Sequence, residues 1–441
     1  MNMKILNITL LSIFLHFVSW ADEGMLIPSL IKAFESDMKA KGMKLSAEDI
    51  YSVNQSSIKD AIFQFGGGCT SEIVSNKGLL LTNHHCGYSQ IQSHSSLENN
   101  YIENGYWAKN LSEELANPGL TAMRIVRIED VTQKIKDGIS IDQIVQEAIE
   151  GTHYDGEVKA FNYGNDFYLM VKETFLDVRF VGTPPNSIGK FGGDTDNWVW
   201  PRHTGDFSVF RIYAGKDNKP AVYSEENVPY TPLHALPISM KERKPGDFTM
   251  VYGFPGRTEQ HVSSSYLEQI ITKERPARIR MRDLSLSVID KAMKNSELVR
   301  IQYASKQARI SNAWKKWIGQ IDGLKRLDAV ALKLEAEAEF TEKANSNQEW
   351  KERYGSIVEQ LNALSDKSFD LEFKYAMGVE YFYYAGPEYF KLIRSTNDLI
   401  MNYAKYKENG TLDEKKKALL KGATGFFKNY NQEIDKEIFK L

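Results

Sequence analysis

The chain has 441 residues, more than one ordinary domain holds, which predicts two or three domains. Hydrophobic residues make up 42% and charged residues 26% of the sequence, values that are typical of a globular protein and exclude a largely disordered chain. The formal net charge is only −3, so the charge gives no indication of binding to nucleic acid or to an acidic membrane surface.

The first 21 residues predict a secretory signal peptide. Lys4 supplies the positive amino-terminal region, residues 5–18 are mostly apolar, and Ser19 and Ala21 have the small-residue spacing of a cleavage site. The alternative is a membrane anchor, but the apolar run is shorter than the roughly 20 residues that a spanning helix needs. We therefore expect export to the periplasm or the cell surface, without stable membrane insertion.

The predicted elements change from helix to strand before residue 86. Apolar residues recur at spacings of three and four between Ile27 and Phe34, which predicts one face of an amphipathic helix. Residues 61–86 alternate apolar runs with glycines and an Asn-Lys-Gly turn at 76–78, which predicts a β-hairpin. Residues 87–119 are polar and rich in turn-forming residues, so we expect a long loop there.

Mixed elements follow as far as residue 264, and helices beyond it. The patterns predict a strand over 120–131, a helix over 141–149, and strands over 167–171, 175–181, 207–213 and 248–252. Lysine, glutamate, alanine and leucine dominate from residue 265 onward, with leucines on one helical face. The predicted class is α+β, with a signal peptide at 1–21, a β-rich catalytic part at 22–264 and an α-helical domain at 265–441.

The chain has only two cysteines, Cys69 and Cys86, and the predicted hairpin turn lies between them. An exported protein can form a disulfide, and the hairpin folds Cys69 back near Cys86, which favours a bridge over two unrelated buried thiols. His85 ends an apolar run and directly precedes Cys86. A catalytic histidine in a chymotrypsin-like protease has this setting, although a lone histidine at a strand end would otherwise be interpreted as structural.

A zinc site is the alternative use of this segment, because His84, His85 and His94 are close in sequence. No acidic residue stands between positions 73 and 96, and the His-Glu-x-x-His pattern is absent. The sequence therefore favours a histidine that acts without a metal, and we expect no cofactor.

A histidine that acts as a general base needs a carboxylate to orient its ring. Asp206 is the preferred candidate, because it directly precedes the strand predicted at 207–213 and follows the histidine in the chain order of chymotrypsin. Asp194 and Asp196 are rivals in the same loop, and a turn-capping role is the structural alternative. No serine has the flanking glycines typical of a nucleophile; Ser89 and Ser356 lie near glycines without that pattern.

Five motifs resemble the bacterial dipeptidyl-peptidase 7 and dipeptidyl-peptidase 11 family of exported serine exopeptidases. They are Phe-Gly-Gly-Gly-Cys-Thr-Ser-Glu at 65–72, Thr-Asn-His-His-Cys-Gly-Tyr at 82–88, Phe-Gly-Gly-Asp-Thr-Asp-Asn-Trp at 191–198, Trp-Pro-Arg-His-Thr-Gly-Asp-Phe at 200–207 and Tyr-Gly-Phe-Pro-Gly-Arg-Thr at 252–258. The resemblance implies a chymotrypsin-like double β-barrel with a large inserted helical domain, and a peptidase that releases dipeptides from free N-termini.

The resemblance also assigns roles to residues of this chain. His85 matches the catalytic base and Asp206 its orienting carboxylate, while Asn197, Trp198 and Asn312 match residues that hold the α-amino group of the substrate. Side-chain carbonyls and an aromatic wall suit an ammonium group. The implied partners are peptides with a free N-terminus and a second copy of the chain in a homodimer.

Family members continue beyond this length into a second barrel that carries the nucleophilic serine. The resemblance therefore implies that these 441 residues are a fragment that ends inside the helical domain and is inactive alone. A naturally short, non-catalytic peptide-binding relative is the alternative, and an unrelated zinc hydrolase is a third hypothesis. The resemblance leaves both an acidic and a hydrophobic side-chain preference for the peptide substrate.

Overall fold

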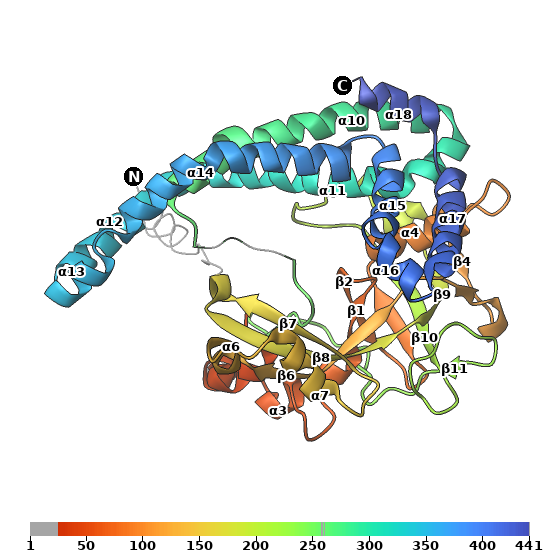
Figure 1. Ribbon diagram of the computed structural model, residues 1–441, viewed down its shortest axis with the longest axis horizontal. Coiled ribbons are helices and arrows are strands. Elements are labelled where there is room, and N and C mark those ends of the chain that lie inside the picture. The colour runs from red at the N-terminus through yellow and green to blue at the C-terminus, as the bar shows by residue number, and fades with distance from the viewer. Residues whose placement is uncertain (1–24, 257–258, 260, 441) are drawn as a thin grey trace, which may run out of the picture. The chain divides into compact units, whose positions relative to one another are not determined.

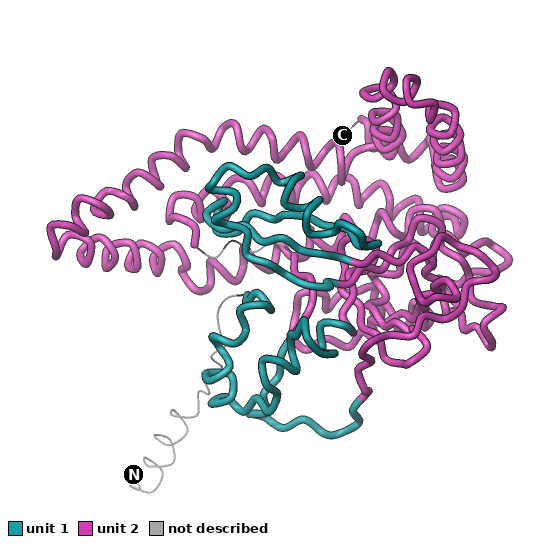
Figure 2. The backbone as a smooth tube through the Cα atoms, turned by 60° about the horizontal axis from the view of Figure 1, so that its bottom comes forward, with its two compact units in different colours: residues 1–60, 125–172, 239–251 teal, residues 61–124, 173–238, 252–441 magenta. Residues whose placement is uncertain are grey.

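The computed structural model describes residues 25–256, 259 and 261–440 (Figure 1), so the predicted signal peptide lies outside the described residues. The chain divides into two compact units (Figure 2). Unit 1 contains the described residues of 1–60, 125–172 and 239–251, and unit 2 contains those of 61–124, 173–238 and 252–441. The predicted domain boundary near residue 264 stays a prediction.

Unit 1 is a β-hairpin with short helices. Strands β7 and β8 pair antiparallel from Asp155 with Lys172 to Phe161 with Asp166. The core of this unit gathers the buried side chains of Val131, Ile144, Leu169 and Val171. Its elements are η1 (Pro28–Phe34), α2 (Glu35–Ala40), α3 (Ala47–Ile50), η2 (Ile58–Ala61, which ends in unit 2), α6 (Thr132–Lys136), α7 (Ile141–Ile149), β7 (Asp155–Phe161) and η4 (Asn162–Gly164). Strands β6 (Ala122–Asp130) and β8 (Asp166–Phe175) contribute residues to both units.

Unit 2 contains an antiparallel sheet in the order β4-β9-β10-β3-β2-β1-β6. These strands are β1 (Ile62–Phe65), β2 (Cys69–Ile73), β3 (Leu79–Thr82), β4 (Tyr106–Trp107), β9 (Asp177–Thr183) and β10 (Ser208–Ala214), with β5 (Leu115–Ala116) on β9 and β11 (Val228–Pro229) on β10. One face of the sheet is closed by a fully buried core around Phe63, Phe175, Phe180 and Phe210. Apolar residues that alternate along these strands supply that core.

The helices of unit 2 begin directly after β3 and dominate the chain after residue 263. They are α4 (His84–His94), α5 (Tyr101–Asn104), η3 (Leu111–Glu113), α8 (Asn186–Gly189), η5 (Phe191–Asp194), α9 (Ser264–Gln269), η6 (Ile270–Glu274), α10 (Arg275–Asn295), α11 (Glu297–Arg326), α12 (Ala329–Asn345), α13 (Gln348–Tyr354), α14 (Ile357–Val379), η7 (Glu380–Ala385), α15 (Tyr389–Met401), α16 (Tyr403–Glu408), α17 (Leu412–Lys428) and α18 (Gln432–Phe439). Helices α10 and α11 lie side by side (Figure 1) and share a core with α18 around Ile289, Tyr303 and Ile434.

Helix α4 is joined to α11 by one buried amide. The Gln92 side chain donates from Nε2 to the Gln302 carbonyl at 2.8 Å, and its Oε1 accepts the Ser305 N–H at 2.8 Å. Ile301 and Ala304 of α11 also belong to the core of the sheet. The helix that begins at the two histidines is therefore held against the long helix that carries Asn312.

The α+β class is confirmed, as are the hairpin at 61–86, the helix at 141–149 and the helical character after residue 264. Two local predictions were wrong, and a third is confirmed only in part. Residues 87–119 are not one long loop, because α4 continues to His94 and α5, β4 and β5 follow it. The described residues 248–252 form no strand. The segment from Ile27 to Phe34 is helical but buries mainly Ile31, with Leu30 and Phe34 exposed.

None of the helices in the described ranges combines the length and the apolar character that crossing a membrane requires.

Candidate active site

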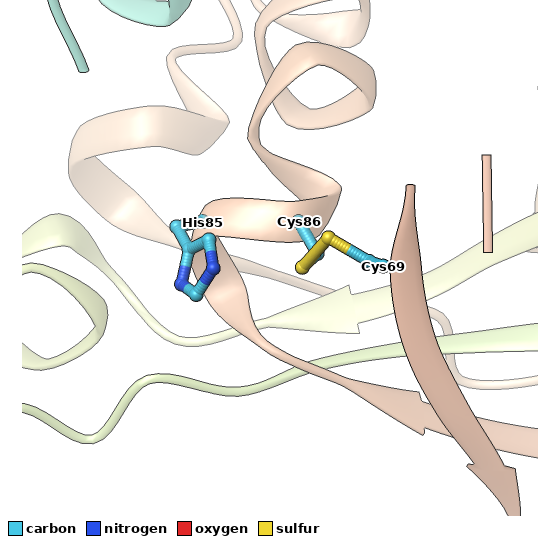
Figure 3. A group of neighbouring side chains, drawn as sticks. All are labelled: Cys69, His85 and Cys86. Atoms are coloured by element: carbon cyan, nitrogen blue, oxygen red, sulfur yellow. A yellow bond between two sulfur atoms is a disulfide. The ribbon is translucent and has the colours of Figure 1, made fainter. Parts of the chain in front are cut away.

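The predicted disulfide is present: Cys69 of β2 is bonded to Cys86 in the first turn of α4. Figure 3 shows the bridge beside the imidazole of His85, which lies next to Cys86 on the same turn. The bridge ties the start of the helix to the sheet. The His85 side chain remains 52% exposed, so its ring is held at its base and open to a ligand at its edge.

Asp206 contacts His85 at two atoms. Its Oδ2 lies 2.7 Å from His85 Nδ1, and its Oδ1 accepts the His85 backbone N–H at 3.0 Å. Strand β10 makes this possible, because Ser208 pairs with Thr82 at the end of β3, so that the residues just before β10 lie beside those just after β3. Asn83 adds a bond from Nδ2 to Asp206 Oδ2 at 3.3 Å.

Close packing of α4 on β10 requires a glycine. A Cβ atom added at Gly87 would lie 2.6 Å from Ser208 Oγ and 2.9 Å from the Phe210 ring. Ser208 Oγ in turn donates to the Asn83 carbonyl at 2.9 Å, at the residue that precedes the helix. Gly87 therefore lets the first turn of α4 approach the strand that follows Asp206.

The charge state of Asp206 suits a ring-orienting group. Burial acts to raise the pKa of this carboxyl group, but the hydrogen bond and charge of His85 and the charge of Arg202 together hold the pKa below its ordinary value. An ionised Asp206 accepts hydrogen bonds only, so the imidazole hydrogen belongs on Nδ1 and His85 Nε2 is left as the basic nitrogen. This is the arrangement of a general base.

The rival carboxylates make other contacts. Asp196 accepts the backbone N–H of His203 and, at 3.2 Å, the hydroxyl of Thr204, so it organises its own loop. Asp194 lies 3.7 Å from Arg202. Neither of the two makes a contact with His85 in the described part of the chain, whereas Asp206 makes two.

Asn312 meets Asn197 and Trp198 although more than a hundred residues of chain separate it from them. Asn312 Oδ1 accepts a hydrogen bond from Asn197 Nδ2 at 2.9 Å and another from Trp198 Nε1 at 3.0 Å. The indole Nε1 also lies 3.1 Å from the Asn312 carbonyl. The structure thus brings the loop at 191–206 and helix α11 together at these three side chains.

One cavity of about 290 Å³ joins the two groups of residues. His85, Asn197 and Asn312 all line it. The other lining residues are Tyr88, Ser89, Lys190, Asp194, Arg202, Ser305, Ala308, Arg309 and Ser311. A small ligand in this cavity would therefore meet a basic ring nitrogen and the paired side-chain amides at the same time.

Arg202 is a further residue of the site that the sequence did not single out. Its guanidinium group lies 3.4 Å from Asn197 Oδ1 and 3.4 Å from Asp206 Oδ2, so it links the amide pair to the carboxylate that holds His85. Its position four residues before Asp206, inside the motif at 200–207, was the available signal.

The three histidines of the zinc hypothesis have separate surroundings. His84 is buried against Tyr88, and burial lowers its pKa to about 4. His94 bonds through Nε2 to Asn117 Oδ1 at 2.9 Å and stacks on Phe180. In the described residues the one cluster with metal-ligand geometry is Cys69, His85 and Cys86, whose sulfurs are joined in the disulfide. The arrangement therefore does not fit a zinc site.

The relatives found by comparison with known proteins agree with one another. The Peptidase S46 family profile matches residues 21–441. The Asp/Glu-specific dipeptidyl-peptidase of Capnocytophaga gingivalis is 44% identical over 95% of this chain, and the dipeptidyl-peptidase 7 of Phocaeicola vulgatus is 41% identical over 96% of it. The chain spans 60% and 61%, respectively, of the lengths of these relatives.

Solved structures agree with the sequence relatives. Porphyromonas endodontalis DPP11 in complex with the dipeptide Arg-Asp superposes with a TM-score of 0.79 at 35% identity, over 94% of this chain and 62% of that one. The complex of the same protein with Arg-Glu gives a TM-score of 0.74 at 34% identity, with the same two coverages. The resemblance found in the five motifs is thereby confirmed: the chain belongs to the Peptidase S46 family.

Proposed function

We propose that this chain provides the base and the amine-binding site of a serine-type dipeptidyl peptidase, which releases dipeptides from the free N-termini of peptides. The observation that carries the proposal is that His85, Asn197 and Asn312 line one small cavity. A base beside an amine-binding site directs the nucleophile that it activates to a peptide bond at a fixed distance from the N-terminus of the substrate. The dipeptides bound to the DPP11 relative and the names of the curated relatives support this reaction.

In the proposed reaction His85 Nε2 takes the proton of a serine hydroxyl as that oxygen attacks the peptide carbonyl. Asp206 stabilises the imidazolium that forms, since the bond between the two side chains is already made. The imidazolium then gives the proton to the leaving amine, and water releases the dipeptide from the acyl-enzyme by the same steps. We assign the nucleophilic serine to a segment outside these 441 residues, because no serine here has the flanking glycines of such a nucleophile.

In this proposal the α-ammonium group of the substrate is bound by Asn197, Trp198 and Asn312. Amide oxygens accept hydrogen bonds from an ammonium group, and an indole face attracts a cation. Lys316 Nζ already lies 5.5 Å from the centre of the Trp198 ring, which supports this ring as a surface for cations. A blocked N-terminus would lose both interactions.

The proposal extends to location and partners. The amino-terminal pattern supports export to the periplasm or the cell surface, and the disulfide fits an oxidising compartment. A homodimer is proposed from the family resemblance alone.

The test is a hydrolysis assay on the complete gene product with a dipeptidyl fluorogenic amide. We expect release of the dipeptide from the free-amine reporter, no cleavage of its N-acetyl form, and loss of activity in His85→Ala at unchanged circular dichroism. Hydrolysis that survives His85→Ala would refute the assignment of the base. Dipeptide binding without any hydrolysis by the wild type would instead favour the non-catalytic peptide-binding relative.

A further inference from the structure

The cavity beside the amine-binding residues is rich in positive charge. Lys190, Arg202 and Arg309 line it. Lys315 of α11 reaches the adjoining loop, where Nζ donates to the Gly193 carbonyl at 3.1 Å and also to the Asp194 carbonyl. Cations this close oppose the entry of another cation, because like charges in a partly buried site repel strongly. A peptide ammonium group therefore needs a negative charge here.

The side-chain amides alone do not meet that need. An ammonium group brings three donors and a full charge, whereas amides are neutral. Asn312 Oδ1 already accepts two hydrogen bonds, from Asn197 and Trp198. Asn197 Oδ1 is 3.4 Å from the Arg202 guanidinium group. Few acceptor positions are thus free on the two amides as they stand.

Asp194 places a carboxylate beside these cations. It is the only carboxylate among the residues that line this cavity in the described part of the chain. Its side chain is 16% exposed, and its enclosed Oδ1 lies 3.7 Å from Arg202 Nη2 and receives no hydrogen bond from the described residues. Burial raises the pKa of this carboxyl group, while the charges of Lys190, Arg202 and Lys315 oppose that effect. A carboxylate that is enclosed and incompletely paired gains from a further donor.

The backbone fixes Asp194 next to the amide pair. Gly192, Gly193 and Asp194 have φ angles of 60°, 65° and 58°, so the chain makes a left-handed turn that glycine adopts readily and aspartate tolerates. The Asn197 N–H donates to the Asp194 carbonyl at 3.0 Å. This turn holds the carboxylate at the wall of the cavity, one short loop away from Asn197.

We propose that Asp194 is the carboxylate that offsets the surrounding cations and binds the α-ammonium group of the substrate together with Asn197 and Asn312. The inference rests on the proposed function, since it names a further residue of the same site. It makes Asp194 the determinant of preference for a free over a blocked N-terminus, a role that neutral amides fill only weakly.

The test is isothermal titration calorimetry of the complete gene product with the dipeptide Arg-Glu and with N-acetyl-Arg-Glu. Asp194→Asn should weaken binding of the free dipeptide at least about tenfold, the usual loss for one charge-assisted hydrogen bond, and leave the acetylated form unchanged. Asp370→Asn is the matched control, because it removes the same charge from a side chain that is 87% exposed and lies outside the cavity. This control should bind like the wild type.

A second variant separates charge balance from local structure. Lys190→Met, added to Asp194→Asn, removes one of the cations whose charge Asp194 offsets and should restore part of the lost affinity. Equal affinity of wild type and Asp194→Asn for Arg-Glu would overturn the proposal, as would an equal loss for both ligands or a double variant that binds no better than Asp194→Asn. A wild-type chain that does not distinguish the two ligands would contradict the amine site itself, and this proposal with it.

Discussion

Asp206 holds both the ring and the backbone of His85, at 2.7 Å from Nδ1 and 3.0 Å from the backbone nitrogen. The two bonds come from different oxygens of one carboxylate, so the ring angle and the start of α4 are set by the same group. Any loss of charge at Asp206 therefore changes both the orientation of the imidazole and the nitrogen that carries its hydrogen.

Asp206→Asn should lower kcat of the complete enzyme by a factor on the order of 10⁴, the loss known for the equivalent change in serine-protease triads. An amide at this position can donate to Nδ1, which places the imidazole hydrogen on the wrong nitrogen. Steady-state kinetics with the free-amine reporter measures the effect, and KM should change little because Asn197 and Asn312 are untouched. A loss of less than tenfold in kcat would refute the role of Asp206.

Gly87→Ala should destabilise the fold by about 1–3 kcal/mol, the usual cost of overpacking, because the new methyl group meets Ser208 and Phe210 at under 3 Å. The displaced turn also carries His85, so activity should fall as well. Urea denaturation measures the free energy of unfolding.

Gly319→Ala is the control for that substitution. Gly319 lies within α11 with no atom near the added methyl group, and the change should stabilise the chain by up to about 1 kcal/mol through helix propensity. Equal effects of the two substitutions would show that the close approach at Gly87 is unimportant.

Removal of the disulfide by replacement of Cys69 and Cys86 with serine should cost about 3 kcal/mol, because the bridge closes a loop between residues 17 positions apart. Thermal unfolding with and without a reducing agent measures it. The reductant should lower the midpoint of the wild type towards that of the double variant and leave the double variant unchanged. A reductant-insensitive wild type would contradict a stabilising bridge.

His84 should make the protein less stable in mild acid. Burial lowers its pKa from 6.5 to about 4, so the unfolded chain takes up a proton on acidification well before the folded chain does. This group should therefore remove about 2 kcal/mol of stability between pH 7 and pH 5. Denaturation at both pH values, compared with His84→Leu, isolates the contribution. The variant should lose less stability than the wild type, and equal losses would show that His84 is not responsible.

The sequence predicted the strands of the hairpin and the disulfide because they rest on local patterns. Alternating apolar residues and the turn at 76–78 define the hairpin, and two cysteines leave one pairing. The chain order also pointed to Asp206 as the partner of His85. The pairing of β3 with β10 holds these two residues together. A predicted strand that ends before His85 and another that begins after Asp206 are enough to suggest this pairing.

Helix α4 was missed because its buried face is partly polar. Tyr88 and Ile91 are joined on that face by Gln92, whose amide is satisfied by backbone groups of α11 more than two hundred residues away. No local pattern records such a partner. The same holds for Asn312, which on composition alone is a solvated helix position and which only the family resemblance indicated. The strand predicted at 248–252 failed for the opposite reason. Its local pattern suits a strand, but the described residues form none there.

The hydrogen bonds that Asn312 Oδ1 accepts from Asn197 and Trp198 have a consequence for the end of the proposed catalytic cycle. The released dipeptide carries the same α-ammonium group as the substrate, so the amine site binds product as well as substrate. When product leaves, the three side chains can bond to one another again instead of facing water unpaired. These re-formed hydrogen bonds lower the free-energy cost of product dissociation. The turnover rate then depends on how readily the three side chains bond to one another again.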